Sequence, residues 1–206
     1  MDGTLLDTTQ VVPDAFVEAI ADLRGPDVDR GDVVAAYSLG VPEAILEHFL
    51  RRSLHSGEEE TYYRRLAQVR VSPYEGIADV LRALRSTGHP VTVFTGASSR
   101  AARSLLSAAG LEVDILVCGD DIARPKPAPD GLLEAARRLG TRPDRIFYLG
   151  DAPTDLLSAE AADAHGVAVA WGHLYRADAA AEHTLQRPAD ALALLHIASA
   201  PERWPS

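Results

Sequence analysis

Hydrophobic positions recur at helical spacing over the first third of the chain. Val12, Phe16 and Ile20 fall on one helical face, and the segments 41–52 and 57–70 show the same periodicity. In segment 57–70 the acidic residues come early and the arginines come late, an order that favours a helix through its dipole. The first third therefore predicts amphipathic helices without strands.

From residue 76 onward, short continuous apolar runs alternate with helical patterns. Such an alternation is typical of a parallel sheet that is covered on both faces. The sequence predicts a doubly wound α/β core, residues 1–8 and 76–206, into which an all-helical segment, residues 9–75, is inserted. The predicted core strands are 90–96, 113–119, 145–151 and 167–172, and the predicted core helices are 77–88, 98–110, 128–140, 153–166 and 187–198.

Composition narrows the class of protein. The formal net charge of −10 would repel nucleic-acid phosphates, so we expect no nucleic-acid partner. No apolar run approaches the roughly 20 residues of a membrane-spanning helix, and the opening residues lack a signal-peptide pattern, so we expect no membrane association. The single cysteine, Cys118, fits a reducing compartment. We expect a cytoplasmic protein, either a monomer or a homodimer.

Polar residues gather where the predicted strands end. Parallel sheets bind ligands beyond the carboxyl ends of their strands, so residues at these positions are candidates for one shared site. A further acidic residue, Asp2, lies in a turn at the start of the chain. The candidates that follow strands are Thr95, Gly96, Lys126, Asp151 and Asp155.

Each candidate also has a simple structural explanation. Thr95 suits a helix cap, although Ser98 is better placed, and Lys126 suits a solvated loop. Asp151 and Asp155 suit the start of a helix. Grouped at successive strand ends, however, these residues are hard to explain as caps. Clustered carboxylates attract a hard divalent cation such as Mg²⁺, whereas a lysine and a hydroxyl suit a bound phosphoryl group. Phosphoryl transfer depends mainly on this kind of positioning and charge neutralisation.

Four segments resemble the motifs of the haloacid dehalogenase-like hydrolase superfamily, in that family's order and spacing. They are DGTLLDT, VTVFTG, RPKPAPD and YLGDAPTD. The resemblance extends over nearly the whole chain and is strongest to C1-capped phosphatases similar to phosphoglycolate phosphatases. It implies that the helical segment 9–75 is the cap.

The resemblance also implies a role for each candidate residue. Metal binding falls to Asp2, Asp151 and Asp155. Phosphate binding falls to Thr95, Gly96 and Lys126. The implied catalytic residues are Asp2, Thr95 and Lys126, with Asp2 as the general acid and then the general base.

The family's nucleophilic aspartate would stand immediately before Met1, at the end of a strand in the middle of the sheet. The usual route, in which an aspartyl-phosphate is later hydrolysed by water, needs this residue. That strand would bury several apolar side chains at about 1.5–3 kcal/mol each, so we expect Met1 to be internal to the natural protein. Asp7, Asp120 and Asp121 are outside the nucleophile's position, and we expect structural roles for them.

The resemblance implies a Mg²⁺-dependent hydrolase that acts on a small phosphorylated metabolite. Two alternatives remain open: a sugar-phosphate mutase similar to β-phosphoglucomutase, and a binding protein that keeps the phosphate pocket without catalysis. Tyr37, Ser38 and Gly40 form a cap loop that is expected to reach the substrate, although a plain turn between helices also fits. His173 would either approach the site or be solvated.

Overall fold

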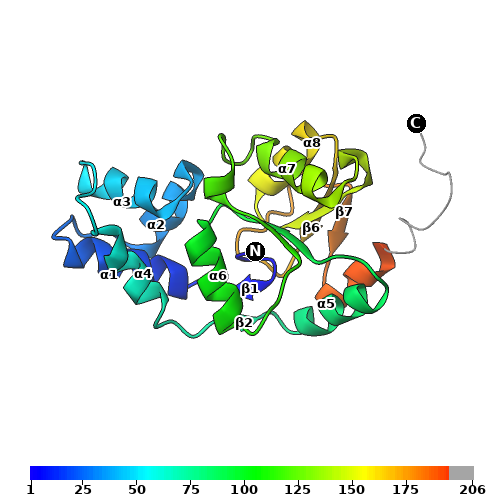
Figure 1. Cartoon of the computed structure of the whole chain (residues 1–206), viewed down its shortest axis with the longest axis horizontal. Helices are drawn as coiled ribbons and strands as arrows, with labels where there is room; N and C mark the ends of the chain where they lie inside the picture. Colours follow the sequence, from blue (N-terminus) through cyan, green and yellow to red (C-terminus); the bar gives the residue numbers. More distant parts are fainter. Residues whose placement is uncertain (195–206) are drawn as a thin grey trace.

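The computed structural model describes residues 1–194 of the chain. A group of helices lies at one side of an α/β core, as Figure 1 shows, and we call this group the helical insert. Its elements are α1 (Val11–Asp22), α2 (Arg30–Ala35), the 3₁₀ helix η1 (Ala36–Leu39), α3 (Pro42–Leu50) and α4 (Glu59–Leu66).

The core alternates helices with strands, as the apolar pattern predicts, so the α/β class is confirmed. Its helices are α5 (Ile77–Ser86), α6 (Ser99–Ala108), α7 (Asp130–Leu139) and α8 (Pro153–Ala161), with the 3₁₀ helices η2 (Gly119–Asp121) and η3 (Pro143–Arg145). Its parallel strands are β3 (Thr92–Phe94), β4 (Ile115–Val117), β5 (Phe147–Gly150), β6 (His165–Val169) and β7 (His183–Leu185).

The parallel strands form two separate sheets rather than the single sheet that we expected. β3 pairs with β4, and β5, β6 and β7 form a second sheet in that order. Residues of β3 and β5, together with residues of α5 and α7, line a cavity of about 500 Å³. Paired strands lie about 4.8 Å apart, so two strands separated by such a cavity cannot pair directly. Within residues 1–194, no other strand joins the two sheets.

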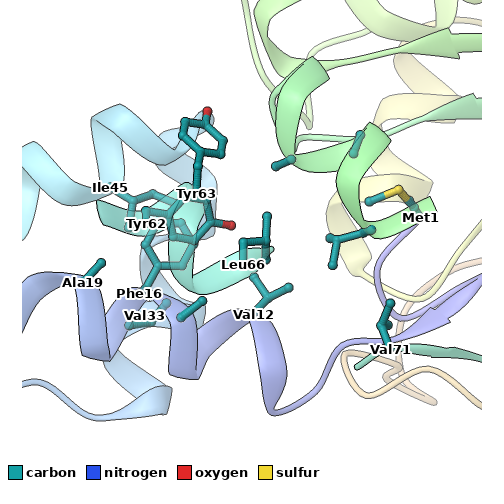
Figure 2. Close-up of a cluster of buried hydrophobic side chains, with 14 of the residues drawn as sticks. Met1, Val12, Phe16, Ala19, Val33, Ile45, Tyr62, Tyr63, Leu66 and Val71 are labelled. Carbon is teal, nitrogen blue, oxygen red and sulfur yellow. The ribbon is translucent and has the colours of Figure 1, made fainter. Parts of the chain in front are cut away.

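Apolar side chains pack between the helices of the insert, in a cluster that continues into the core at Leu6, Val93 and Leu105. Phe16 of α1 stacks on Tyr62 of α4 with ring centroids 4.1 Å apart, and Tyr63 meets the Tyr62 ring edge-on at 5.3 Å. Figure 2 shows Phe16 and Tyr62 between the two helices that carry them. Aromatic pairs of this kind contribute about 0.5–1.5 kcal/mol beyond their buried area. The hydrophobic face predicted for the first helix is therefore the face that packs against α4.

Local sequence signals set the ends of the insert helices. The Asp29 side chain caps α2 by accepting a hydrogen bond from the Asp32 N–H at 2.9 Å. Pro42 stands in the first turn of α3, where its missing N–H leaves no hydrogen bond unmade. Gly40, which precedes α3, has a φ of 101°, a conformation that favours glycine.

The two connections between the core and the helical insert lie side by side. Their short strands, β1 (Leu6–Asp7) and β2 (Ser72–Pro73), pair antiparallel. The Tyr74 N–H also donates to the Leu5 carbonyl at 3.0 Å. The chain therefore leaves the core and re-enters it at one place.

The carboxyl-terminal part differs from the sequence prediction. β7 was not predicted, because its polar residues lack an apolar run, yet it pairs in parallel with β6. The predicted helix 187–198 contains instead a 3₁₀ helix, η4 (Pro188–Leu192), and its end falls outside the described residues. Over residues 1–194, no single helix is long and apolar enough to cross a membrane, although one bent pair, 30–39 with 42–50, meets that test by length and composition.

Candidate active site

The first residues form a turn that lies against the end of β5. The Gly3 N–H donates to the Leu6 carbonyl at 3.0 Å, and the Leu5 N–H donates to the Met1 carbonyl at 2.8 Å. Gly3 has a φ of 71°, and a methyl group at its α-carbon would lie 2.1 Å from Asp151 Oδ2. The turn therefore requires glycine both for its backbone conformation and for the close approach of Asp151.

Asp151 follows β5 and is 5% exposed. Its Oδ2 accepts a hydrogen bond from the Leu174 N–H at 3.0 Å, and its Oδ1 lies 3.4 Å from Thr4 Oγ1, which is a long hydrogen bond. Burial raises the pKa of the Asp151 carboxyl; the Leu174 N–H opposes this rise, and the negative charge of Asp155 adds to it. A carboxylate so placed is stabilised by a nearby cation.

Asp2 has a buried oxygen that lacks a partner. Among residues 1–194, nothing hydrogen-bonds its Oδ1. After burial, the charge of Asp2 is the next largest cause of the raised pKa values of Tyr37 and Tyr62. Buried polar atoms are normally paired, and hard divalent cations prefer carboxylate oxygens. The Asp151 carboxylate therefore fits a divalent cation such as Mg²⁺, and the unpaired Asp2 oxygen is free to contact a ligand.

Lys126 is held in place by Asp155. Lys126 Nζ lies 2.6 Å from Asp155 Oδ1, which also accepts from the Tyr148 hydroxyl at 3.2 Å. Asp155 Oδ2 accepts from the Ala152 N–H at 3.0 Å, so both carboxylate oxygens are engaged. Burial opposes the charge on Lys126, but Asp155 and Tyr148 outweigh it, so the Lys126 pKa is raised. Burial likewise opposes the Asp155 charge, but Lys126 outweighs it and lowers the Asp155 pKa. The pair is an ion pair at neutral pH.

The Met1 α-amino group lies among these charges. Burial lowers its pKa, the Asp2, Asp155 and Asp151 carboxylates oppose that change, and the Lys126 ammonium adds to it. Figure 2 shows the Met1 side chain on the core side of the apolar cluster. The charges of four of the residues singled out from the sequence therefore act on the same α-amino group.

Thr95 is buried in the loop after β3 and does not cap the next helix. Its Oγ1 accepts from the Ala97 N–H at 3.3 Å, whereas Ser98 caps α6 by accepting from the Ala101 N–H at 3.3 Å. The cap explanation for Thr95 is therefore wrong, and Ser98 has that role. Tyr148 also lies close to this loop. Its hydroxyl donates a hydrogen bond to the carbonyl of Phe94, the residue before Thr95, at 3.3 Å.

Gly96 lies where the insert meets two core loops. A methyl group on Gly119, after β4, would lie 2.4 Å from the Gly96 carbonyl oxygen and 3.2 Å from Cγ1 of Val41 in the insert. The loop after β3, the loop after β4 and the segment that precedes α3 therefore pack together.

The insert loop approaches the core. Gly40 faces Pro125, since a methyl group on Gly40 would lie 4.0 Å from Pro125 Cβ. Tyr37 is half-buried, and its raised pKa comes from burial and from the charge of Asp2. Ser38 is exposed. The charge of Asp2 therefore acts on the Tyr37 hydroxyl and contributes to its raised pKa.

The other acids near the site have structural contacts, as expected. Asp7 accepts from the Thr9 hydroxyl at 2.7 Å, where the chain leaves the core. Asp120 accepts from the Ser99 hydroxyl at 2.8 Å, and Asp121 accepts from the Cys118 N–H at 2.9 Å.

Sequence reasoning missed Tyr148 and the segment 171–174. Tyr148 belongs to an apolar strand, where a tyrosine is ordinarily read as core. Trp171 donates from Nε1 to the Thr4 carbonyl at 2.9 Å, which ties this segment to the first turn. The position of His173 was left open; its positive charge would lower the Asp151 pKa, and its buried Nδ1 has no hydrogen-bond partner among residues 1–194.

Buried carboxylates, a lysine held by an ion pair and a buried threonine follow the strands of this α/β core. Residues 1–163 match the family described as haloacid dehalogenase-like hydrolase, and the chain belongs to this family. The resemblance found in the four motifs is therefore confirmed.

Relatives of the chain are named as phosphatases. This chain is 33% identical over 190 residues to the N-acetylmuramic acid 6-phosphate phosphatase of Pseudomonas aeruginosa. The matched region covers 86% of this chain and 82% of that protein. It is 31% identical to the probable phosphatase IndB of Dickeya dadantii over 84% of this chain and 79% of that protein. It is 26% identical to the phosphoglycolate phosphatase of Aquifex aeolicus over 95% and 93%. The chain is an enzyme of the phosphatase class.

Solved structures have the same fold. CbbY from Rhodobacter sphaeroides, determined in complex with phosphate, superposes with a TM-score of 0.79 at 25% identity, over 92% of each chain. A predicted phosphoglycolate phosphatase from Haemophilus somnus superposes with a TM-score of 0.76 at 19% identity, over 95% of each chain, which is evidence for the fold alone.

Proposed function

We propose that this protein is a Mg²⁺-dependent phosphatase that releases phosphate from a small phosphomonoester. The observation that carries the proposal is the combination of the buried Asp151, the half-buried Asp2 with its one buried, unpaired oxygen, and Lys126 held by Asp155. The acids suit a cation and the lysine suits a phosphoryl group, and phosphoryl transfer requires this combination.

Asp151, through its carboxylate, and Asp2, through its backbone carbonyl, are the residues that would hold Mg²⁺, which leaves the Asp2 carboxyl free to carry a proton. The bound cation would offset the negative charges of the Asp151 carboxylate and of the phosphate. Asp155 has both oxygens engaged by hydrogen bonds, so we assign it a supporting role through Lys126 rather than direct ligation.

The substrate phosphate would be bound by the loop after β3 and by Lys126. The Thr95 hydroxyl, the Gly96 backbone N–H and the Lys126 ammonium supply the hydrogen-bond donors. The raised pKa of Lys126 keeps its amine protonated at neutral pH.

We further propose a covalent aspartyl-phosphate on the residue that immediately precedes Met1. The carboxylate there would attack phosphorus while the ester oxygen departs with a proton from Asp2. Water, deprotonated by Asp2, would then attack the acyl-phosphate and release inorganic phosphate. The support for this position is the burial of Met1, whose α-amino pKa is affected by the charges of Lys126, Asp151 and Asp155.

We propose that the helical insert, residues 9–75, acts as a cap that selects the leaving group. Tyr37, Ser38 and Gly40 are the insert residues assigned to that contact, and the approach of Tyr37 to Asp2 supports it. The named activities of the relatives support a small phosphorylated metabolite as substrate. The free, buried thiol of Cys118 supports placement in the cytoplasm.

The direct test is hydrolysis of p-nitrophenyl phosphate by a chain extended ahead of Met1 with an apolar strand that ends in aspartate. We expect phosphate release that depends on Mg²⁺ and stops with EDTA. The matched control carries asparagine in place of that added aspartate, and Asp151→Asn in the active version should abolish the Mg²⁺-dependent release of phosphate. Equal rates for the aspartate and asparagine versions would contradict the covalent route.

The alternatives separate in the same assay. A mutase would interconvert sugar phosphates and release little phosphate, so sugar-phosphate interconversion is measured beside phosphate release. Phosphate binding without hydrolysis by the extended chain would favour a binding protein over a phosphatase.

A further inference from the structure

A chain of hydrogen bonds joins the helical insert to the loop after β3. Tyr63 of α4 is 7% exposed and Ser98, the cap of α6, is 4% exposed. The Tyr63 hydroxyl lies 2.8 Å from Ser98 Oγ and 2.8 Å from Glu43 Oε1. Since the Glu43 carboxylate can only accept, Tyr63 donates to Glu43 and Ser98 donates to Tyr63. Ser98 in turn accepts from the Ala101 N–H, so the donor and the acceptor of each of these hydrogen bonds are defined.

Arg100 of α6 closes the same contact from the solvent side. Its guanidinium lies 4.1 Å from the centre of the Tyr63 ring, within the range of a cation–π interaction. Two of its nitrogens bond the Glu60 carboxylate of α4, one of them at 2.7 Å. Tyr63 is therefore held on its hydroxyl by Ser98 and on its face by Arg100.

The contact is next to the proposed phosphate site. Ser98 is three residues beyond Thr95 and begins the helix that follows the phosphate-binding loop. A movement of α4 away from the core would break the Tyr63–Ser98 bond and leave the Ser98 hydroxyl without its acceptor. The position of the insert is thereby coupled to the conformation of residues 95–98.

We propose that Tyr63, supported by the Arg100–Glu60 pair, is a positioning residue: it clasps the insert to α6 and fixes the phosphate-binding loop. The effect of this clasp on phosphate binding rests on the proposed function. The contact between the insert and α6 does not depend on it. A net hydrogen bond of ordinary strength corresponds to about a three- to ten-fold change in an equilibrium constant. Tyr63→Phe keeps the ring and its contact with Arg100 and removes only the hydroxyl.

The test compares Tyr63→Phe and Glu60→Gln with a matched control, Asp22→Asn. Asp22 pairs at 2.7 Å with Arg65, also on α4, but that ion pair stays inside the insert. Amide hydrogen exchange at residues 99–103 reports the clasp, and titration with inorganic phosphate and Mg²⁺ reports the loop. We expect about three- to ten-fold faster exchange and a similarly weaker phosphate affinity for Tyr63→Phe, a smaller change in the same direction for Glu60→Gln, and no change for Asp22→Asn.

The two readouts fail independently. Equal exchange at residues 99–103 in Tyr63→Phe and Asp22→Asn would overturn the clasp. Faster exchange in Tyr63→Phe with unchanged phosphate affinity would overturn the positioning role. Absence of phosphate binding in the parent chain would contradict the proposed function while the exchange comparison still decides the clasp. Glu60→Gln provides a second test of the clasp in a variant that we expect to fold normally, since the ion pair that it removes is half-exposed.

Discussion

The helical insert and the core sheet are packed to different degrees. The insert buries its large side chains against one another, with Leu46 and Tyr62 almost fully inaccessible. In the core, the sheet is split between β3 and β5, and the cavity of about 500 Å³ is lined mainly by apolar side chains. Because the two sheets do not pair directly, contacts between side chains and backbone link them. Tyr148 of β5 reaches the Phe94 carbonyl of β3, and Lys126 lies 5.4 Å from the Phe94 ring.

The largest expected effect comes from filling the cavity. An apolar strand of four or five residues fused ahead of Met1 would bury several side chains at about 1.5–3 kcal/mol each. We expect about 4 kcal/mol or more of added stability and a Tm higher by about 10 °C. Thermal unfolding followed by circular dichroism measures it. A glycine–serine extension of equal length is the control, and equal Tm values for the two fusions would show that the cavity does not accept a strand.

Truncating one leucine in each region tests the same comparison from the other side. Leu46 in the insert is fully buried, whereas Leu149 lines the cavity. Leu46→Ala opens a new void and should cost about 4 kcal/mol, while Leu149→Ala enlarges an existing one and should cost about 2 kcal/mol. Urea denaturation at equilibrium measures both. A larger loss for Leu149→Ala would mean that the core is packed as tightly as the insert.

Two glycines with positive φ separate backbone strain from crowding. Gly57 of the insert has a φ of 87° with open space around it, whereas Gly3 faces Asp151. Gly57→Ala should cost about 1 kcal/mol through strain alone. Gly3→Ala adds a steric clash and should cost about 3 kcal/mol, and it should also weaken Mg²⁺ binding by displacing Asp151. Denaturation and Mg²⁺ titration measure the two effects; equal losses at both positions would contradict the close packing of Gly3.

Much of the fold and of the site could be predicted from the sequence, because the signals were local. The periodicity of Val12, Phe16 and Ile20 predicts α1, and apolar runs predict β3 to β6. Lys126 and Asp155 lie in the segments that follow β4 and β5, and residues after parallel strands gather at one end of an α/β core.

The remainder depends on contacts between distant segments, which local patterns do not encode. Tyr63 reads as part of an amphipathic helix, and only the packing of α4 on α6 turns its hydroxyl toward Ser98. Likewise, nothing in the segment around Asp155 indicates that Lys126, Tyr148 and a backbone N–H would occupy its carboxylate.

The smallest expected effect concerns two hydroxyls on the walls of the cavity. Tyr148→Phe removes the donor to Asp155, whose carboxylate keeps Lys126 and the Ala152 N–H, so we expect a loss of about 1 kcal/mol rather than collapse of the ion pair. The hydroxyl of Thr92, in contrast, is buried and has no partner among residues 1–194. Thr92→Val replaces it with a methyl group of the same shape and should be neutral or slightly stabilising. Urea denaturation of the two variants measures the difference. If Tyr148→Phe loses no stability, the Tyr148 hydroxyl contributes nothing across the split sheet.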